Sequence, residues 1–237
     1  MKPAEVLKIQ LKELGSAYRK LRKRFKEKDV HDFRLKIKRL RAFVILFAYD
    51  KRNPSKIPNK LKVLYDCAGA IRNLQLQRKR ILLTWGNTGE IRDGSYLKLL
   101  SAEEEQWRRK ALQLNSPLKK LRKNLRVPGS IPDKAVRKFI HAKTARLWTL
   151  LRANDIGDKD LHLLRKILKV ILYNWHYAGI YTGQNLPACW QHKKDVRLFT
   201  EVLGAFHDVC MALQFLNTKM TEITDVEEVE ALRKIEA

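Results

Sequence analysis

Cysteine, proline and glycine are scarce in this chain of 237 residues, and each scarcity removes a class of protein. The three cysteines, Cys67, Cys189 and Cys210, lie far apart, so there is no CxxC spacing for zinc or thiol redox chemistry and no disulfide framework is implied. We expect them to be small core residues in a reducing cytosol. Seven prolines and ten glycines are too few for a β-sandwich, a collagen-like chain or a linker-rich chain.

Long apolar runs are also missing. The longest run, from Phe43 to Tyr49, is far shorter than the roughly 20 residues that a membrane helix needs. The N-terminus reaches charged residues almost at once, which is unlike a signal peptide. We therefore expect a soluble, cytoplasmic protein that does not associate with membranes.

Acidic residues are outnumbered two to one, with 25 Asp and Glu against 50 Lys and Arg, so the formal net charge is +25. Hydrophobic residues make up 45% of the chain, the proportion of a folded protein, so the charge does not signal disorder. Most of the excess lies before residue 131. A field of this sign attracts polyanions such as nucleic acid, inorganic polyphosphate, acidic proteins and anionic membrane surfaces.

Helix-forming Leu, Lys, Arg, Ala and Glu dominate the composition, which predicts an all-α fold. The densest cluster of helix breakers, residues 127–132, predicts a boundary between a first half, 1–128, and a second half, 129–237. Each half is expected to hold about four helices. Their expected ranges are 3–28, 29–49, 59–85 and 95–114, with a short helix from 116, and then 133–153, 158–181, 188–217 and 222–235.

The two halves share a pattern. A histidine, an arginine and a lysine recur at positions i, i+3 and i+7, as His31, Arg34 and Lys38 and again as His162, Arg165 and Lys169. The following helices share a second match, Gly69-Ala-Ile-Arg-Asn73 with Gly204-Ala-Phe-His-Asp208. Because both matches occur in the same order and at nearly the same separation, they predict an internal duplication into two pseudo-symmetric four-helix bundles.

Each triplet forms a basic stripe, since these three positions fall within about 60° of one another around a helix. We call His31, Arg34 and Lys38 the first stripe and His162, Arg165 and Lys169 the second. Most basic runs are solvent-exposed helix faces, but a face that only contacts solvent does not require histidine at the same position in both halves. Two such stripes brought together by the duplication would suit a chain of phosphates, because each contact to a phosphate oxygen is charge-assisted.

These residues resemble a known family. His31-Asp-Phe-Arg34-x-x-x-Lys38-Arg39-Leu-Arg41 followed by Gly69-x-x-Arg72, and His162-x-x-Arg165-Lys166-x-x-Lys169 followed by Leu203-Gly204-x-x-x-Asp208, look like the two halves of a CHAD domain. The resemblance implies two helical bundles, a basic central surface that binds inorganic polyphosphate, no cofactor, and localisation at polyphosphate granules. The binding residues it implies are His31, Arg34, Lys38, Arg39, Arg41, Arg72, His162, Arg165, Lys166 and Lys169, with His207 standing where the first half has Arg72.

Catalytic signatures are absent from the sequence, which has no GxxxxGK[ST] phosphate loop and no HExxH. The acidic cluster at Glu103–Glu105 is expected to be a solvated face, since consecutive residues diverge around a helix. We therefore expect a binding protein and not an enzyme. The alternative is a basic helical protein that binds RNA or DNA. Single-strand binders add aromatic platforms for base stacking, whereas the tryptophans at 85, 107, 148 and 190 are expected to pack in the core.

Overall fold

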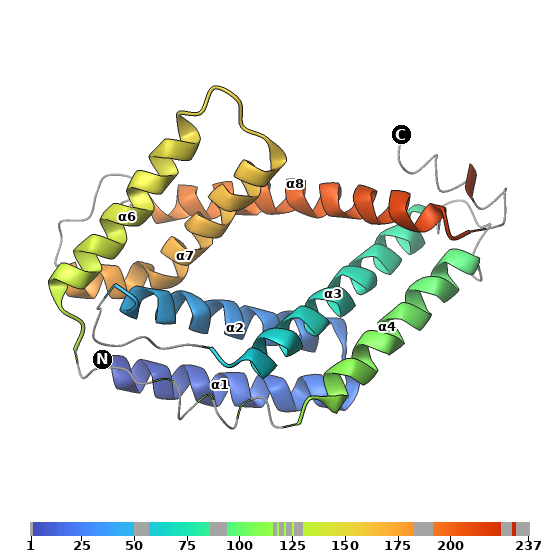
Figure 1. Ribbon diagram of the computed structural model, residues 1–237, viewed down its shortest axis with the longest axis horizontal. Coiled ribbons are helices and arrows are strands. Elements are labelled where there is room, and N and C mark those ends of the chain that lie inside the picture. Colours follow the sequence, from blue (N-terminus) through green and yellow to red (C-terminus); the bar gives the residue numbers. More distant parts are fainter. Residues whose placement is uncertain are drawn as a thin grey trace. The chain divides into compact units, whose positions relative to one another are not determined.

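The computed structural model describes residues 2–49, 57–85, 94–115, 118, 121, 125, 130–182, 192–223 and 229–230. Its helices are α1 (Pro3–Arg24), α2 (Glu27–Phe47), α3 (Asn59–Trp85), α4 (Ser95–Gln113), α6 (Asp133–Leu151), α7 (Asp158–Thr182) and α8 (Lys193–Met220) (Figure 1). No strand occurs among the described residues, so the all-α fold class is confirmed for them. In the same residues, no helix is both long and apolar enough to span a bilayer.

Three of the expected features lie at least half outside the described residues. They are the start of the short helix at 116, the first half of the breaker cluster at 127–132 and most of the helix at 222–235. The side chains of Trp85 and Trp190 and the whole of Cys189 are also outside this set.

Phe25 sets the joint between α1 and α2. Its φ of 47° lies in the left-handed region, so α1 ends at Arg24, four residues earlier than the sequence predicts. Glycine usually takes this position after a helix, and a phenylalanine gives no such signal in the sequence. The ring is buried, which holds the backbone in this conformation. As a result α2 begins at Glu27, two residues earlier than expected, and His31 lies in its second turn.

The chain forms two compact units, each built from three segments. Unit 1 comprises Met1–Ala17, Leu35–Pro58 and Leu118–His207, and unit 2 comprises Tyr18–Arg34, Asn59–Pro117 and Asp208–Ala237. Each unit takes segments from both sides of residue 128, so the units and the expected halves, 1–128 and 129–237, divide the chain differently. The internal duplication stays a prediction about the sequence.

In unit 1, α6 and α7 pack side by side (Figure 1). α6 buries Phe139 in the core and α7 buries Leu164. The buried amide of Asn174 on α7 donates a hydrogen bond of 2.8 Å to the carbonyl oxygen of Ala42 on α2. Since a buried amide without a partner is costly, this bond ties α7 to the part of α2 that carries Lys38.

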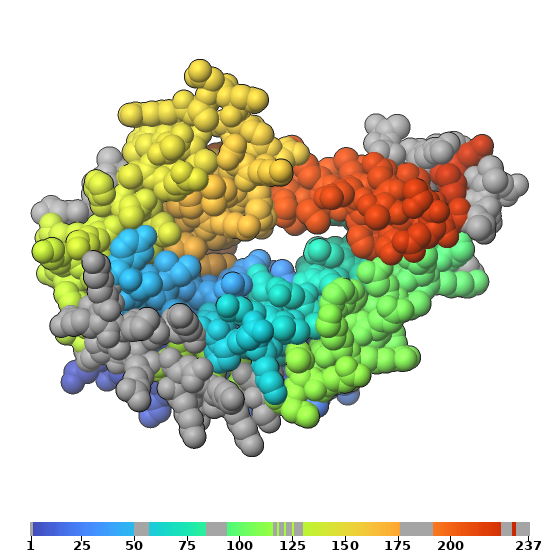
Figure 2. Space-filling view, viewed as in Figure 1, coloured from blue at the N-terminus to red at the C-terminus, as the bar shows by residue number. Residues whose placement is uncertain are grey.

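In unit 2, α3 and α4 pack side by side, and the C-terminal part of α8 lies against α4 (Figures 1 and 2). Lys219 of α8 forms an ion pair with Glu103 of α4 at 3.2 Å. Trp107 packs against the apolar core of this unit, as expected. That core contains Leu74, Ile81, Tyr96, Leu97, Leu100 and Leu216.

Two expectations about single side chains are wrong. Glu104 is only 6% exposed and not solvated, because its carboxylate accepts hydrogen bonds from Arg108 and from the amide of Gln75, which compensate its burial. Trp148 is 48% exposed, since it points away from the buried face of α6. Of the described cysteines, Cys67 is buried as expected and Cys210 is half-buried.

Candidate functional site

The second stripe lies on α7 in unit 1. His162, Arg165 and Lys169 share a helix face with Lys166, whereas Leu164 and Leu168 lie in the core. This division follows from the helical repeat, since residues three and four apart share a face. Lys166 is exposed, and the other three basic side chains are half-buried against neighbouring helices.

His162 stacks on His207 of α8. The ring centroids are 4.1 Å apart and the planes are tilted by 36°. Burial, followed by the charges of His207, Lys166, Arg165 and Lys38, lowers the pKa of His162 from 6.5 to about 4. Lys38 comes from α2, so a first-stripe residue joins the second stripe within unit 1. The imidazole is therefore neutral at neutral pH and lies among cations.

Arg165 lies against Gly204 of α8. A Cβ at this glycine would stand 3.1 Å from Nη2 and 3.2 Å from Nε of Arg165, closer than side chains normally approach. The glycine thus makes room for the guanidinium. Within the described residues, Arg165 Nε and His162 Nδ1 are buried without a hydrogen-bond partner. Two adjacent polar groups without partners are typical of a site that takes a polar ligand or water.

Lys169 is the last residue of the second stripe. Burial is the main cause that lowers the pKa of Lys169. The charges of nearby Arg165 and Arg197 lower this pKa further, while the Glu201 carboxylate raises it. An anion that replaced water around Lys169 would offset this cost. The second stripe and its neighbours therefore form a cationic cluster in unit 1 that a bound polyanion would stabilise.

Arg34 occupies the matching position in unit 2, against Gly69 of α3. A Cβ at Gly69 would overlap Nη1 of Arg34. That nitrogen donates a hydrogen bond of 2.9 Å to the carbonyl oxygen of Tyr65, and the guanidinium carbon lies 4.5 Å from the centre of the Tyr65 ring. Burial lowers the pKa of Arg34 below its usual range. Arg34 is thus partly engaged in holding α2 to α3, in addition to any role in binding.

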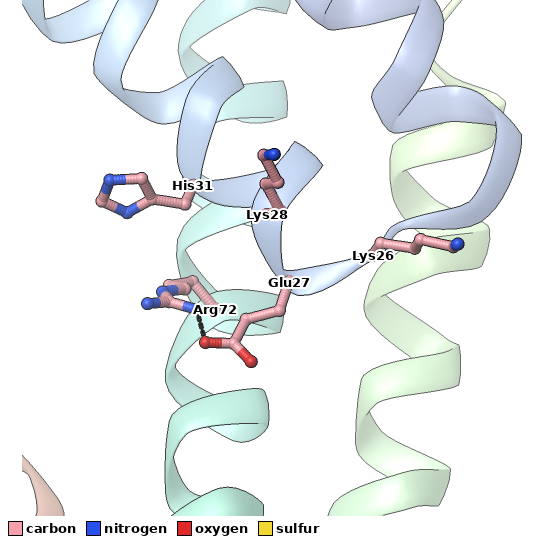
Figure 3. Close-up of a pocket in the computed structure, with 5 residues that line it drawn as sticks. All are labelled: Lys26, Glu27, Lys28, His31 and Arg72. Carbon is pink, nitrogen blue, oxygen red and sulfur yellow. Dashed lines mark hydrogen bonds and ion pairs between the residues drawn. The ribbon is translucent and has the colours of Figure 1, made fainter.

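A surface pocket in unit 2 contains His31 and Arg72 (Figure 3). Arg72 Nη1 donates to Glu27 Oε1 at 2.6 Å, and the His31 ring projects to the same side as the Arg72 guanidinium. The hydrogen bond from Arg72 outweighs burial and holds the pKa of Glu27 below its ordinary value. Lys28 and Lys26 complete the lining, and Lys26 extends away from the ion pair.

The expected binding residues thus form two groups. Lys38, His162, Arg165, Lys166, Lys169 and His207 lie together in unit 1, and His31, Arg34 and Arg72 lie together in unit 2. Arg39 and Arg41 are exposed on α2 in unit 1. Arg39 lies about 100° around the helix from Lys38, because it is the next residue, and so points to another side.

Glu27 and Tyr65 are the neighbours of the site that the sequence reasoning missed. A signal for Glu27 existed, since an acidic residue precedes each stripe histidine by four positions, Glu27 before His31 and Asp158 before His162. For Tyr65 there was none, because Arg34 binds its backbone carbonyl oxygen, which every residue type offers.

Another cluster of basic side chains lies on α6, where Lys134, Arg137, Lys138 and His141 line an open hollow. They are exposed and share one helix face by their spacing. Among the residues that the structure describes, no group of three His, Cys, Asp or Glu side chains is arranged to hold a metal ion.

Comparison with known proteins identifies the family. The family model for the CHAD domain matches residues 5–217, so the chain belongs to the CHAD domain family, as its sequence motifs predict. The crystal structure of the CHAD domain from the plant Ricinus communis is similar, with a TM-score of 0.64 and 18% identity over 98% of this chain and 83% of that one. At this identity the likeness shows a shared fold. No curated protein matches the chain.

Proposed function

We propose that this protein binds inorganic polyphosphate without a chemical step, through the second stripe and its neighbours in unit 1. Membership of the CHAD family, which is often linked to polyphosphate binding, supports the proposal. The observation that carries it is the surroundings of His162, where the charges that lower the pKa are imidazole, guanidinium and ammonium groups. Concentrating cations in this way costs stability, and a chain of phosphates removes that cost.

The chemistry of the cluster fits a phosphate chain. Arginine and lysine donate to phosphate oxygens in charge-assisted hydrogen bonds worth roughly 1.5–3 kcal/mol each. Arg165 Nε and His162 Nδ1 are buried without partners, and both lie next to exposed Lys166. A linear polyanion can contact several of these groups at once, whereas a single small anion contacts few.

Single-stranded nucleic acid is the competitor to test. Trp148 is exposed on α6, with the guanidinium of Arg152 at 5.6 Å from its ring centre, and exposed aromatic rings can stack bases. In a competition titration, polyphosphate labelled at one end is bound to the protein and displaced with single-stranded RNA of equal charge. We expect displacement only at a large excess of RNA. Equal displacement that Trp148→Ala abolishes would favour the nucleic-acid function instead.

The binding residues are tested with a matched pair of arginine variants. Arg165→Ala removes a charge from the second stripe, and Arg137→Ala removes one from the exposed cluster on α6. We expect Arg165→Ala to weaken binding about tenfold or more, the value of one charge-assisted contact, and Arg137→Ala to change it less than threefold. Equal losses would mean that net charge alone drives binding, which would refute the site.

Salt and chain length give a second test of the same proposal. Because phosphate binding releases counterions, the logarithm of the affinity should fall linearly with the logarithm of the salt concentration. Arg165→Ala should make this slope shallower by about one contact. Affinity should rise with the number of phosphates. An affinity that is independent of both would contradict binding through phosphate contacts.

A further inference from the structure

The pocket in unit 2 contains an acidic side chain among its basic ones. Glu27 contacts Arg72 at 2.6 Å, so one of the binding residues expected from the sequence is already paired with an anion (Figure 3). Lys79 and His31 also attract the Glu27 carboxylate. The carboxylate is bound where positive charge converges. Its side chain is nevertheless 42% exposed, so it can turn out to solvent, while Arg72 is 19% exposed.

The matching positions in unit 1 differ in this respect. Asp158 precedes His162 by four residues, as Glu27 precedes His31, and His207 stands at the position that matches Arg72. Asp158 is exposed, and the charged groups that shift the pKa of His162 are basic. The acidic neighbour of the unit 1 cluster is instead Glu201, which acts on Lys169 at the other end of the second stripe and pairs with Arg197 at 3.0 Å.

We propose that Glu27 is the internal anion of the unit 2 pocket, which holds Arg72 in the free protein and is displaced by a phosphate group of the ligand. The inference rests on the proposed function, because it extends phosphate binding to a second group of the expected binding residues, His31 and Arg72 in unit 2. Carboxylate and phosphate oxygens accept the same guanidinium hydrogen bonds, so the two compete for Arg72. An incoming anion must therefore bind Arg72 more strongly than the Glu27 carboxylate does, which favours phosphate chains over small, weakly binding anions.

The chain offers a closely matched control. Glu13 pairs with Lys36 in unit 1 at 2.8 Å, with side-chain exposures of 45% and 19%, against 42% and 19% for Glu27 and Arg72. Glu27→Gln and Glu13→Gln thus remove the same charge from ion pairs of similar burial. Glu27→Asp keeps the charge but shortens the side chain by one methylene, which withdraws the carboxylate from Arg72.

The experiment is calorimetric titration of the full chain with tripolyphosphate at low ionic strength. We expect Glu27→Gln to bind about five- to tenfold more tightly than the wild type, because the competing carboxylate is gone, and Glu13→Gln to bind within twofold of it. Glu27→Asp should gain part of this increase. Thermal melts should show a lower melting temperature for free Glu27→Gln and a larger upward shift on adding tripolyphosphate.

The inference is overturned if Glu27→Gln binds no more tightly than the wild type, which would mean that the carboxylate only positions Arg72. It is also overturned if Glu13→Gln gains as much, since the effect would then be net charge. Neither result affects the proposed function, which fails separately if wild-type protein does not bind polyphosphate or if Arg165→Ala binds it unchanged. If Glu27→Gln is unfolded, Glu27→Asp decides, and an affinity equal to that of the wild type refutes the inference.

Discussion

The lowered pKa of His162 predicts how stability changes with pH. Its pKa is about 4 in the folded protein and 6.5 when unperturbed, so the unfolded chain takes up a proton first as the pH falls. The contribution of His162 to the free energy of unfolding is therefore fully present above pH 6.5 and is lost as the pH falls towards 4. Between pH 7.5 and pH 5 the full shift corresponds to a loss of about 2 kcal/mol, and because solvent reaches part of the ring we expect about 1 kcal/mol.

The measurement is urea denaturation of the wild type and of His162→Phe at several pH values from 7.5 to 5. Phenylalanine keeps a ring against His207 but cannot titrate, so the wild type should lose about 1 kcal/mol more than the variant over this range. His141→Gln, which removes an exposed histidine on α6, is the control and should follow the wild type. Equal losses for wild type and His162→Phe would refute the reasoning.

Burial lowers the pKa of His162 most, and the charges of His207, Lys166, Arg165 and Lys38 lower it further. Phosphate oxygens beside His162 should counter these charges, so polyphosphate should reduce the pH dependence. Binding then takes up protons below about pH 6.5. The uptake appears as a binding heat that depends on the ionisation enthalpy of the buffer. It should be absent in His162→Phe, and an equal uptake in that variant would assign the proton to another group.

Three further substitutions test the packing around the site. Gly204→Ala should displace Arg165 and so weaken polyphosphate binding severalfold. The melting temperature should stay the same, because the helix preference of alanine over glycine, about 1 kcal/mol, offsets the closer contact. A lower melting temperature with unchanged affinity would contradict this. Asn174→Ala should cost about 2 kcal/mol in urea denaturation, because it leaves the Ala42 carbonyl oxygen without its bond, and a loss under about 0.5 kcal/mol would refute that role. Glu104→Gln should cost about 1–3 kcal/mol in the same assay and leave polyphosphate affinity unchanged, and a loss of affinity would link α4 to binding.

Local patterns in the sequence predict most of the helices and the composition of the second stripe. The spacing of His162, Arg165 and Lys169 puts them on one face whatever surrounds the helix, and the structure has them so. The recurrence of Gly69 and Gly204 also marks a real feature, because each glycine makes room for the arginine of a stripe. These features depend on residues a few positions apart or on a repeated motif.

The features that the sequence did not reveal depend on tertiary neighbours. Arg34 is expected as a ligand-binding residue, but it also bonds the Tyr65 carbonyl oxygen on another helix. Glu104 belongs to an acidic run, yet it is buried because Gln75 and Arg108 donate to it. Phe25 takes a left-handed conformation that its residue type disfavours. In each case packing outweighs the local preference, and only the folded structure shows which preference is overridden.

The interleaved segments of the two units set an order for folding on the ribosome. The last segment of unit 1 ends at His207, whereas unit 2 requires residues from Asp208 onward. All segments of unit 1 have therefore left the ribosome before the last segment of unit 2, so unit 1 can complete its core first. Before Leu216 emerges, Tyr96 and its apolar neighbours lack one of their packing partners, so the nascent chain exposes apolar surface that the folded protein buries.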